Sequence, residues 1–221
     1  MNPLRQLLKS AGSHAPLGTW IMAASPLVTE AMGHAGFQWG VIDMEHTPLD
    51  MMEVIHLLQA AGNTKMVPIV RVPWNDTVSI KRVLDAGAQT LLIPFVQNAD
   101  EAQRAVAATR YPPEGVRGLA GMSRGSKFGT VPDYCKAANK TVGAVLQLET
   151  PAAVAQLGFA AADQHLRATL EVIESCPCEG GCPSCVQSPK CGNGNEPLDK
   201  AGAAALLRAI LAGTDGATAA E

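Results

Sequence analysis

The sequence predicts an α/β fold: an incomplete (β/α) TIM-type barrel of about five β-α units, followed by a small helical, Cys-rich zinc-binding module. Three observations lead to this prediction. Short, almost wholly apolar segments alternate with amphipathic segments over about the first 157 residues. No Gly-x-Gly-x-x-Gly follows the first apolar segment, which disfavours a dinucleotide-binding sheet. Five of the six cysteines lie within sixteen positions near the end of the chain.

The apolar segments are short and lie between helical patterns, which is typical of buried parallel strands. We expect strands at residues 19–22, 39–43, 66–72, 90–96 and 142–148. Apolar residues at helical intervals, with Gly36 and Gly62 as stop signals, predict the intervening helices. These helices are expected at residues 26–34, 49–61, 76–85 and 100–110, and two more are expected at 164–174 and 201–211. No strand-like run follows the fifth strand, so the barrel pattern stops at five units.

Composition and charge limit the class of protein. The 221 residues are 47% hydrophobic and 17% charged, which is enough apolar material for a sizeable core. The formal net charge of −3 gives no bias toward nucleic acid or an anionic membrane. No apolar run of about 18 residues and no leader-like stretch is present. We therefore expect a cytoplasmic protein whose cysteines are reduced or metal-bound.

Three regions are predicted along the chain: a partial barrel at residues 1–157, a Cys-cluster module at 158–212 and a flexible tail at 213–221. Residues 158–221 contain four basic and eight acidic side chains, which gives a local net charge of −4. Independent binding of nucleic acid is not expected of this part, because such binding gains affinity from phosphate contacts by Lys and Arg.

Polar side chains follow the predicted strands at the ends where parallel sheets place catalytic groups. Arg71 can bind a carboxylate through paired N–H donors, and His46 can act as a general base. Glu149 offers a hard oxygen ligand for Mg²⁺ or Mn²⁺. Each alone is more often an ordinary surface residue, but together at consecutive strand ends they favour a site for a 2-oxo acid. The strand-end set is Asp43, Glu45, His46, Arg71, Gln147 and Glu149.

A resemblance to a known family adds to this interpretation. It is carried by GTWIMAASPLVTEAMGHAGFQWGVIDMEHTPLD, VRVPWND, DAGAQTLLIPFVQNADEAQRAVAATRYPPEGVRG and VLQLET. Over about residues 1–157 the chain resembles the HpcH/HpaI aldolase family, in its 4-hydroxy-2-oxoheptanedioate and 2-keto-3-deoxy-L-rhamnonate branch. The resemblance implies an oligomeric (β/α)8 barrel that uses Mg²⁺, Mn²⁺ or Co²⁺ to enolise pyruvate.

The resemblance also implies catalytic roles, carried over by position. His46 resembles the catalytic base, and Asp85, on the helix after the third strand, resembles its partner carboxylate. Arg71 resembles the arginine that binds pyruvate and stabilises the transition state.

Further positions resemble those that bind substrate and metal. Gln147 resembles a residue that contacts the substrate, and Trp20 and Asp43 match other pocket positions. Glu149 resembles the first ligand of the catalytic metal. The family's second metal-binding carboxylate lies in a Gly-Pro-x-Asp-Leu motif after a sixth strand, and this sequence contains no such motif.

The cysteines near the end of the chain have the spacing Cys-x-Cys-x3-Cys-x2-Cys-x5-Cys. Glycines and prolines between the thiols allow the tight turns with which four sulfurs can surround one structural Zn²⁺. Four of the five thiols suffice, and the sequence leaves open which four. Cys135, apart from the others, is expected to be a buried apolar residue. The candidate zinc ligands are Cys176, Cys178, Cys182, Cys185 and Cys191.

A second resemblance covers about residues 158–211, where CPSCVQSPKCGNGNEPLDK is similar to the C-terminal zinc-binding region of MrfA-type DEAD/DEAH-box helicases. In those proteins the region accompanies ATP-driven motor domains in DNA repair, but this chain has no Gly-x4-Gly-Lys-[Ser/Thr] loop. The two resemblances together predict a chimera.

The expected function is that of a metal-dependent class II aldolase, an aldehyde-lyase that cleaves 4-hydroxy-2-oxo acids to pyruvate and an aldehyde. Its partners would be these small molecules, with homo-oligomerisation if the barrel is completed. The alternative is a non-catalytic chimera whose folded functional part is a structural zinc module from a DNA-repair helicase. Release of pyruvate from such a substrate would support the first hypothesis. Stoichiometric zinc without turnover would support the second.

Overall fold

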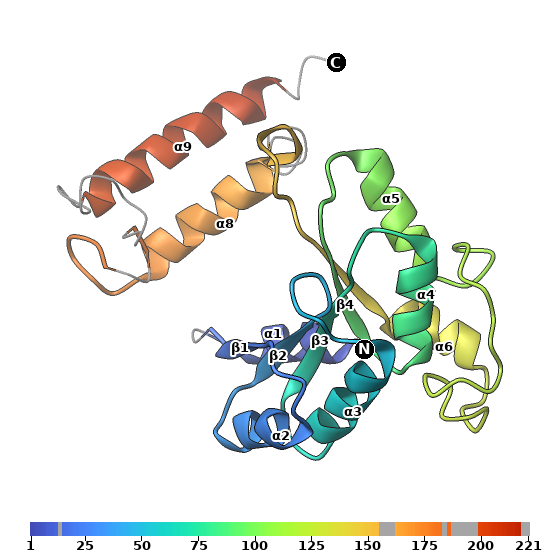
Figure 1. Cartoon of the computed structure of the whole chain (residues 1–221). Helices are drawn as coiled ribbons and strands as arrows, with labels where there is room; N and C mark the ends of the chain where they lie inside the picture. Colours follow the sequence, from blue (N-terminus) through green and yellow to red (C-terminus); the bar gives the residue numbers. More distant parts are fainter. Residues whose placement is uncertain (13–14, 155–161, 183–184, 187–198, 218–221) are drawn as a thin grey trace. The chain divides into compact units, whose positions relative to one another are not determined.

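The computed structural model describes the chain except for residues 13–14, 155–161, 183–184, 187–198 and 218–221 (Figure 1). The chain divides into two compact units, Met1–Val154 and Ala155–Glu221. The boundary that the sequence predicts, at 157/158, falls among residues outside the described ranges.

The first unit contains a five-stranded sheet in which every neighbouring pair is parallel and the strand order is β1-β2-β3-β4-β5. A doubly wound sheet would reverse its strand order at a switch point, whereas strands that follow chain order are the beginning of a barrel. The predicted fold class is thus confirmed as a parallel α/β sheet of the partial TIM type. The strands are β1 Gly18–Ile21, β2 Trp39–Asp43, β3 Val67–Arg71, β4 Thr90–Ile93 and β5 Gly143–Leu146.

Helices begin at residues whose side chains cap them. Asp50 forms a capping box with Glu53, while Ser25, Asp76 and Asn98 accept hydrogen bonds from the first turns of their helices. The helix α6 was not predicted, because its sequence YCKAANKT is short and rich in polar residues, and Asp133 at its start makes no side-chain cap hydrogen bond. The helices of this unit are α1 Pro3–Ser10, α2 Pro26–His34, α3 Met51–Gly62, α4 Thr77–Asp85, α5 Ala99–Ala108 and α6 Tyr134–Thr141.

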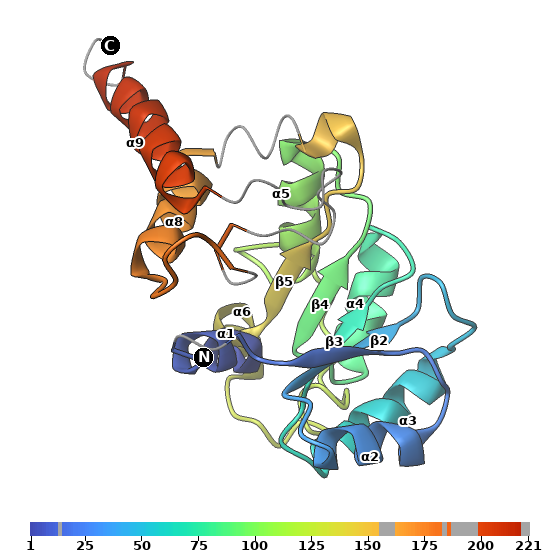
Figure 2. The same cartoon turned by 90° about the vertical axis from the view of Figure 1, so that its left-hand side faces the viewer.

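The two faces of the sheet differ in burial. Figures 1 and 2 show α2, α3 and α4 on the same side of the strands, and the side chains that alternate toward the helices, such as Ile42 and Val70, are fully buried. On the opposite face, Leu4 of α1 packs with Val41 and Ile69. Farther along this face Trp20 is 44% exposed. The helix-covered face therefore forms the main core.

The second unit contains α8 Ala162–Ser175 and α9 Lys200–Ala217, which lie side by side (Figure 1). Ile173, Ala204 and Leu211 are its buried apolar side chains among the described residues. The helix α9 continues to Ala217, past residue 213 where the sequence predicts a tail, and residues 218–221 lie outside the described ranges. None of the helices that the structure describes is long and apolar enough to cross a membrane.

The core on the helix side of the sheet predicts a stability effect. Truncating the fully buried Ile42 to alanine should lower the free energy of unfolding of the first unit by about 3 kcal/mol, because it removes packing and leaves a cavity. Urea unfolding followed by tryptophan fluorescence measures the change. Leu27→Ala is the control: Leu27 is 77% exposed, so its truncation should change stability by less than about 0.5 kcal/mol. Equal effects of the two substitutions would contradict this description of the core.

Candidate functional site

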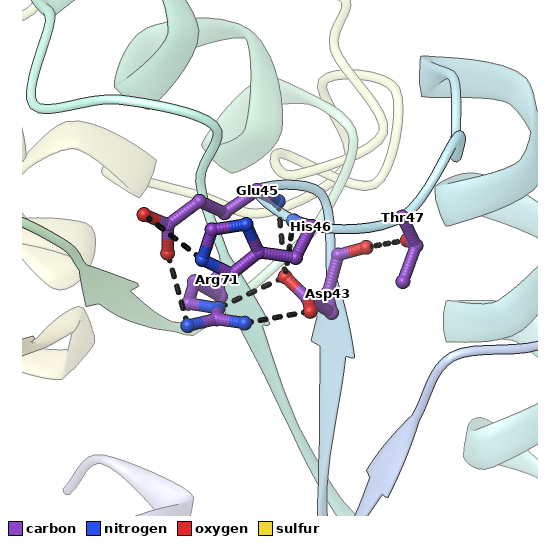
Figure 3. A network of polar contacts seen from close by, with 5 residues as sticks. All are labelled: Asp43, Glu45, His46, Thr47 and Arg71. Atoms are coloured by element: carbon purple, nitrogen blue, oxygen red, sulfur yellow. Dashed lines mark hydrogen bonds and ion pairs between the residues drawn. The ribbon is translucent and has the colours of Figure 1, made fainter.

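The centre of the candidate site is a buried ion pair between adjacent strands. Asp43 ends β2 and Arg71 ends β3, and the two residues are directly paired in the parallel register. Their side chains therefore project from the same face of the sheet at its carboxyl end. Arg71 Nε donates to Asp43 Oδ1 at 2.9 Å, and Nη2 donates to Oδ2 at 2.6 Å (Figure 3).

Asp43 also organises the loop that follows β2. The backbone N–H groups of Glu45 and His46 donate to Asp43 Oδ1 at 2.9 and 3.3 Å, and the Thr47 hydroxyl donates to the Asp43 carbonyl oxygen. Burial of the Asp43 carboxyl opposes its ionisation, but the hydrogen bonds from Arg71 and from these two N–H groups prevail and lower its pKa below 3.8. Asp43 is therefore a carboxylate at neutral pH.

The guanidinium of Arg71 has further partners on two sides. Its Nη1 lies 2.9 Å from Glu45 Oε2, and its central carbon lies 4.4 Å from the centroid of the Trp20 ring. The pKa of Arg71 is raised, first by the hydrogen bond to Asp43; burial opposes this, and the negative charges of Asp43, Glu45 and Glu149 add to it. Arg71 is thus held as a fixed cation at the strand ends.

Glu45 links the cation to the predicted base. Its Oε1 lies 3.7 Å from His46 Nε2, while its other oxygen faces Arg71 (Figure 3). The His46 side chain is 69% exposed, so a ligand can reach the imidazole. The sequence placed Glu45 at a strand end but gave no role for it, because nothing in the spacing shows that one carboxylate can contact both neighbours.

Gln147 and Glu149 follow β5. Glu149 is exposed, and its charge acts on Arg71, which places it near the same end of the sheet. Gln147 Oε1 is buried and has no hydrogen-bond donor in the described part of the chain. Glu45 Oε2 is buried as well, but it faces Arg71 Nη1 at 2.9 Å. An oxygen acceptor without a donor, such as Gln147 Oε1, suits a hard cation or its bound water.

Asp85 lies elsewhere. It ends α4, and a helix that connects two parallel strands ends at the amino end of the sheet, whereas His46 follows the carboxyl end of β2. The Asp85 carboxylate accepts a hydrogen bond from Arg117 Nη2 at 2.7 Å, and the Arg117 guanidinium lies over the Tyr111 ring. Burial raises the pKa of Tyr111 to about 12, against the charge of Arg117. Within one chain, Asp85 and His46 are therefore not brought together.

Two aromatic side chains that the sequence analysis did not single out lie on loops at the carboxyl end of the sheet. Trp74 follows β3 and Phe95 follows β4, and their rings stack with centroids 5.2 Å apart. The backbone of Phe95 has a φ of 56°, in the left-handed region that a phenylalanine rarely adopts. The sequence does not reveal the positive φ of Phe95, and it therefore does not predict that Trp74 and Phe95 stack.

A second cluster lies in the second unit. The sulfur atoms of Cys176, Cys178, Cys182 and Cys185 lie within 4.8 Å of one another, and four of the separations are 3.5, 3.5, 3.5 and 3.8 Å. A tetrahedral site with Zn–S bonds of about 2.3 Å would place its sulfurs about 3.8 Å apart. Cys191 lies outside the described residues.

Cys135, in the first unit, is half-buried rather than buried. The prediction of a buried apolar residue is therefore corrected. Cys135 lies near the start of α6, a helix that the sequence analysis did not predict.

A parallel sheet in barrel order, with a charged cluster at its carboxyl end, is the arrangement of barrel-type enzymes. Comparison with known proteins gives the family: the chain belongs to the HpcH/HpaI aldolase/citrate lyase family, whose family model matches residues 17–168. The resemblance to this family is thereby confirmed.

Relatives and solved structures agree with this assignment. The chain is 49% identical over 143 residues to a 2-dehydro-3,6-dideoxy-6-sulfogluconate aldolase of Pseudomonas putida, covering 65% of this chain and 56% of the relative. It is 46% identical over 154 residues to a 5-keto-4-deoxy-D-glucarate aldolase of Salmonella arizonae, covering 70% and 60%. A family structure from Burkholderia cenocepacia superposes with a TM-score of 0.68 at 40% identity, covering 73% of this chain and 65% of that one. The chain thus spans about three-fifths of these relatives.

The buried ion pair predicts a pH-dependent stability. Because the folded pKa of Asp43 is lowered below 3.8, its contribution is fully present above that pH and is lost as the pH falls through the folded value. Asp43→Asn should cost about 3 kcal/mol at pH 7, because it leaves the guanidinium of Arg71 without its charged partner. Urea unfolding between pH 7 and pH 2.5 should show this difference shrinking below about pH 4.

The matched control is Glu114→Gln, which removes an exposed ion pair with Arg110. It should change stability by less than about 0.5 kcal/mol throughout the same range. A difference between wild type and Asp43→Asn that stays constant to the lowest pH would contradict the linkage.

Proposed function

We propose that this chain carries the pyruvate-binding and proton-transfer residues of a metal-dependent class II aldolase, which cleaves 4-hydroxy-2-oxo acids to pyruvate and an aldehyde. The observation that carries the proposal is the cluster of Asp43, Arg71, Glu45 and His46 at the carboxyl end of a parallel sheet. Two relatives named as aldolases of sugar acids support this reaction class.

Arg71 is proposed to bind the keto acid with the donors that its fixed position leaves available. Nε and one Nη2 hydrogen are directed to Asp43, and Nη1 faces Glu45. A guanidinium has five N–H donors, so some remain for substrate oxygens. Because Asp43 holds the guanidinium rigidly, these donors are oriented before the substrate arrives. They can stabilise negative charge that develops on the keto oxygen.

His46 is proposed to move the proton. Its imidazole is 69% exposed and its Nε2 lies 3.7 Å from Glu45 Oε1, so a bound substrate can reach the ring nitrogen. In the cleavage direction the base removes the proton of the 4-hydroxyl group; the bond between carbons 3 and 4 breaks and the aldehyde leaves. The electron pair left on carbon 3 is delocalised into the 2-oxo group, and a proton returned to that carbon completes pyruvate.

The oxygen-rich surroundings fit a divalent cation. Glu149 would hold it, with Gln147 positioned to accept a hydrogen bond from a coordinated water, and the orphaned Gln147 Oε1 supports this role. Mg²⁺ is commonly bound through one or two carboxylates together with the substrate, so one carboxylate suits a metal that binds with the keto acid. When bound, the cation would supply Lewis acidity toward the ketone.

The catalytic proposal is tested by pyruvate release from a 4-hydroxy-2-oxo acid in the presence of Mn²⁺, coupled to lactate dehydrogenase. His46→Ala should lower the rate by at least about 100-fold, because the general base is lost. Glu149→Gln should abolish the response to added metal. The control is His56→Ala, an exposed histidine on α3, which should keep full activity. Turnover in wild type that is unchanged by His46→Ala would contradict the assignment.

A second candidate function belongs to the second unit and is favoured by a separate observation, the tetrahedral spacing of four sulfurs. We propose that Cys176, Cys178, Cys182 and Cys185 bind one structural Zn²⁺. Four thiolates leave no open coordination position, which is typical of a structural site and not of a catalytic one. The predicted origin in a helicase-type zinc module is part of this proposal.

Zinc analysis tests the thiolate site independently of turnover. The purified chain should retain about one Zn²⁺ after dialysis. Cys182→Ser should lose it, because three thiolates hold zinc less tightly than four. Cys135→Ser and Glu149→Ala should retain it, since neither belongs to the thiolate cluster. Wild-type protein without zinc after reconstitution under reducing conditions would remove the proposal.

A further inference from the structure

Lys200, the first residue of α9, is bonded to the loop that carries the cysteines. Its Nζ donates to the carbonyl oxygens of Cys176 and Cys178 at 2.6 and 2.7 Å. Its backbone N–H donates to the carbonyl oxygen of Gly180 at 3.2 Å. The start of α9 is therefore tied at three points to the segment that follows α8.

The charge of Lys200 suits a thiolate metal site. One Zn²⁺ with four thiolates has a formal charge of about −2, so a nearby cation stabilises it. The Lys200 ammonium lies within hydrogen-bond distance of the backbone of two of the four proposed ligands. The backbone N–H of Cys182 lies 3.4 Å from the Cys185 sulfur and adds a donor to the same site.

The packing of the helix pair explains why such a link matters. Among the described residues of this unit, the buried apolar side chains are Ile173, Ala204 and Leu211. The ion pair between Arg208 and Glu174 that also joins the helices is exposed, and exposed pairs contribute little. A small unit with so few buried side chains commonly depends on a metal or a disulfide for its stability.

We propose that Lys200 is a positioning residue of the thiolate site and couples zinc binding to the docking of α9 on α8. The proposal rests on the zinc site proposed above. Binding converts four thiols to thiolates and releases about four protons for each zinc ion, with no change of oxidation state. The Lys200 ammonium holds the two cysteine carbonyls in place and offsets the negative charge that binding creates.

The experiment measures zinc affinity of the full-length chain by competition with a chromophoric chelator under reducing conditions. Lys200→Met keeps the length of the side chain but removes its donors and charge, and should weaken binding about tenfold or more. Lys200→Arg keeps both and should recover most of the affinity. Arg208→Met removes the exposed ion pair with Glu174 and should change affinity less than about threefold.

Far-UV circular dichroism provides a readout that affinity alone does not. Zinc added to the metal-free chain should raise helicity, and at saturating zinc Lys200→Met should show a smaller gain than wild type. Wild-type affinity in Lys200→Met overturns the role of Lys200 and leaves the zinc site standing. If Arg208→Met weakens zinc binding as much as Lys200→Met does, the role of Lys200 is also overturned. That result would reflect the general stability of the pair of helices α8 and α9. No zinc binding by wild type overturns the site itself and the role of Lys200 with it.

Discussion

The first unit depends on one interaction, the paired hydrogen bonds between Asp43 and Arg71. Burying two charges costs free energy, and only good geometry with further hydrogen bonds recovers it. Parallel register supplies that geometry, because the two residues are direct partners at the ends of β2 and β3. The same carboxylate oxygen accepts the backbone N–H groups of Glu45 and His46. The position of the candidate base is therefore set by the ion pair and not by the loop alone.

This dependence explains how much could be predicted. The sequence predicts the five strands and the grouping of Asp43, His46 and Arg71, because apolar runs mark strands and parallel strands end at one edge. The sequence does not predict contacts that depend on the direction of side chains. Nothing in the spacing shows that Glu45 contacts both Arg71 and His46, and Asp85 lies at the far end of the sheet because α4 runs opposite to the strands. Adjacency in the chain was a poor guide to adjacency in space.

The candidate site carries more negative than positive charge. The positive side chain of the cluster, Arg71, is already paired with two carboxylates, and Glu149 adds a third negative charge near it. The buried Gln147 Oε1 adds an acceptor that has no donor among the described residues. A keto acid, itself an anion, would approach such a site against repulsion. A divalent cation would offset that repulsion, so the charges of this chain support the proposed metal site.

The two units reach stability by different means. The first buries whole side chains between a sheet and its helices, whereas the second has a thin apolar core and a thiol cluster at the ends of its two helices. The family match extends to residue 168, inside α8, although α8 packs against α9 in the second unit. The family match describes the sequence of the first part of α8, whereas the contacts of α8 with α9 show which unit this helix stabilises. A segment of aldolase-like sequence can thus form one half of a helix pair in the second unit, provided that its apolar face meets α9.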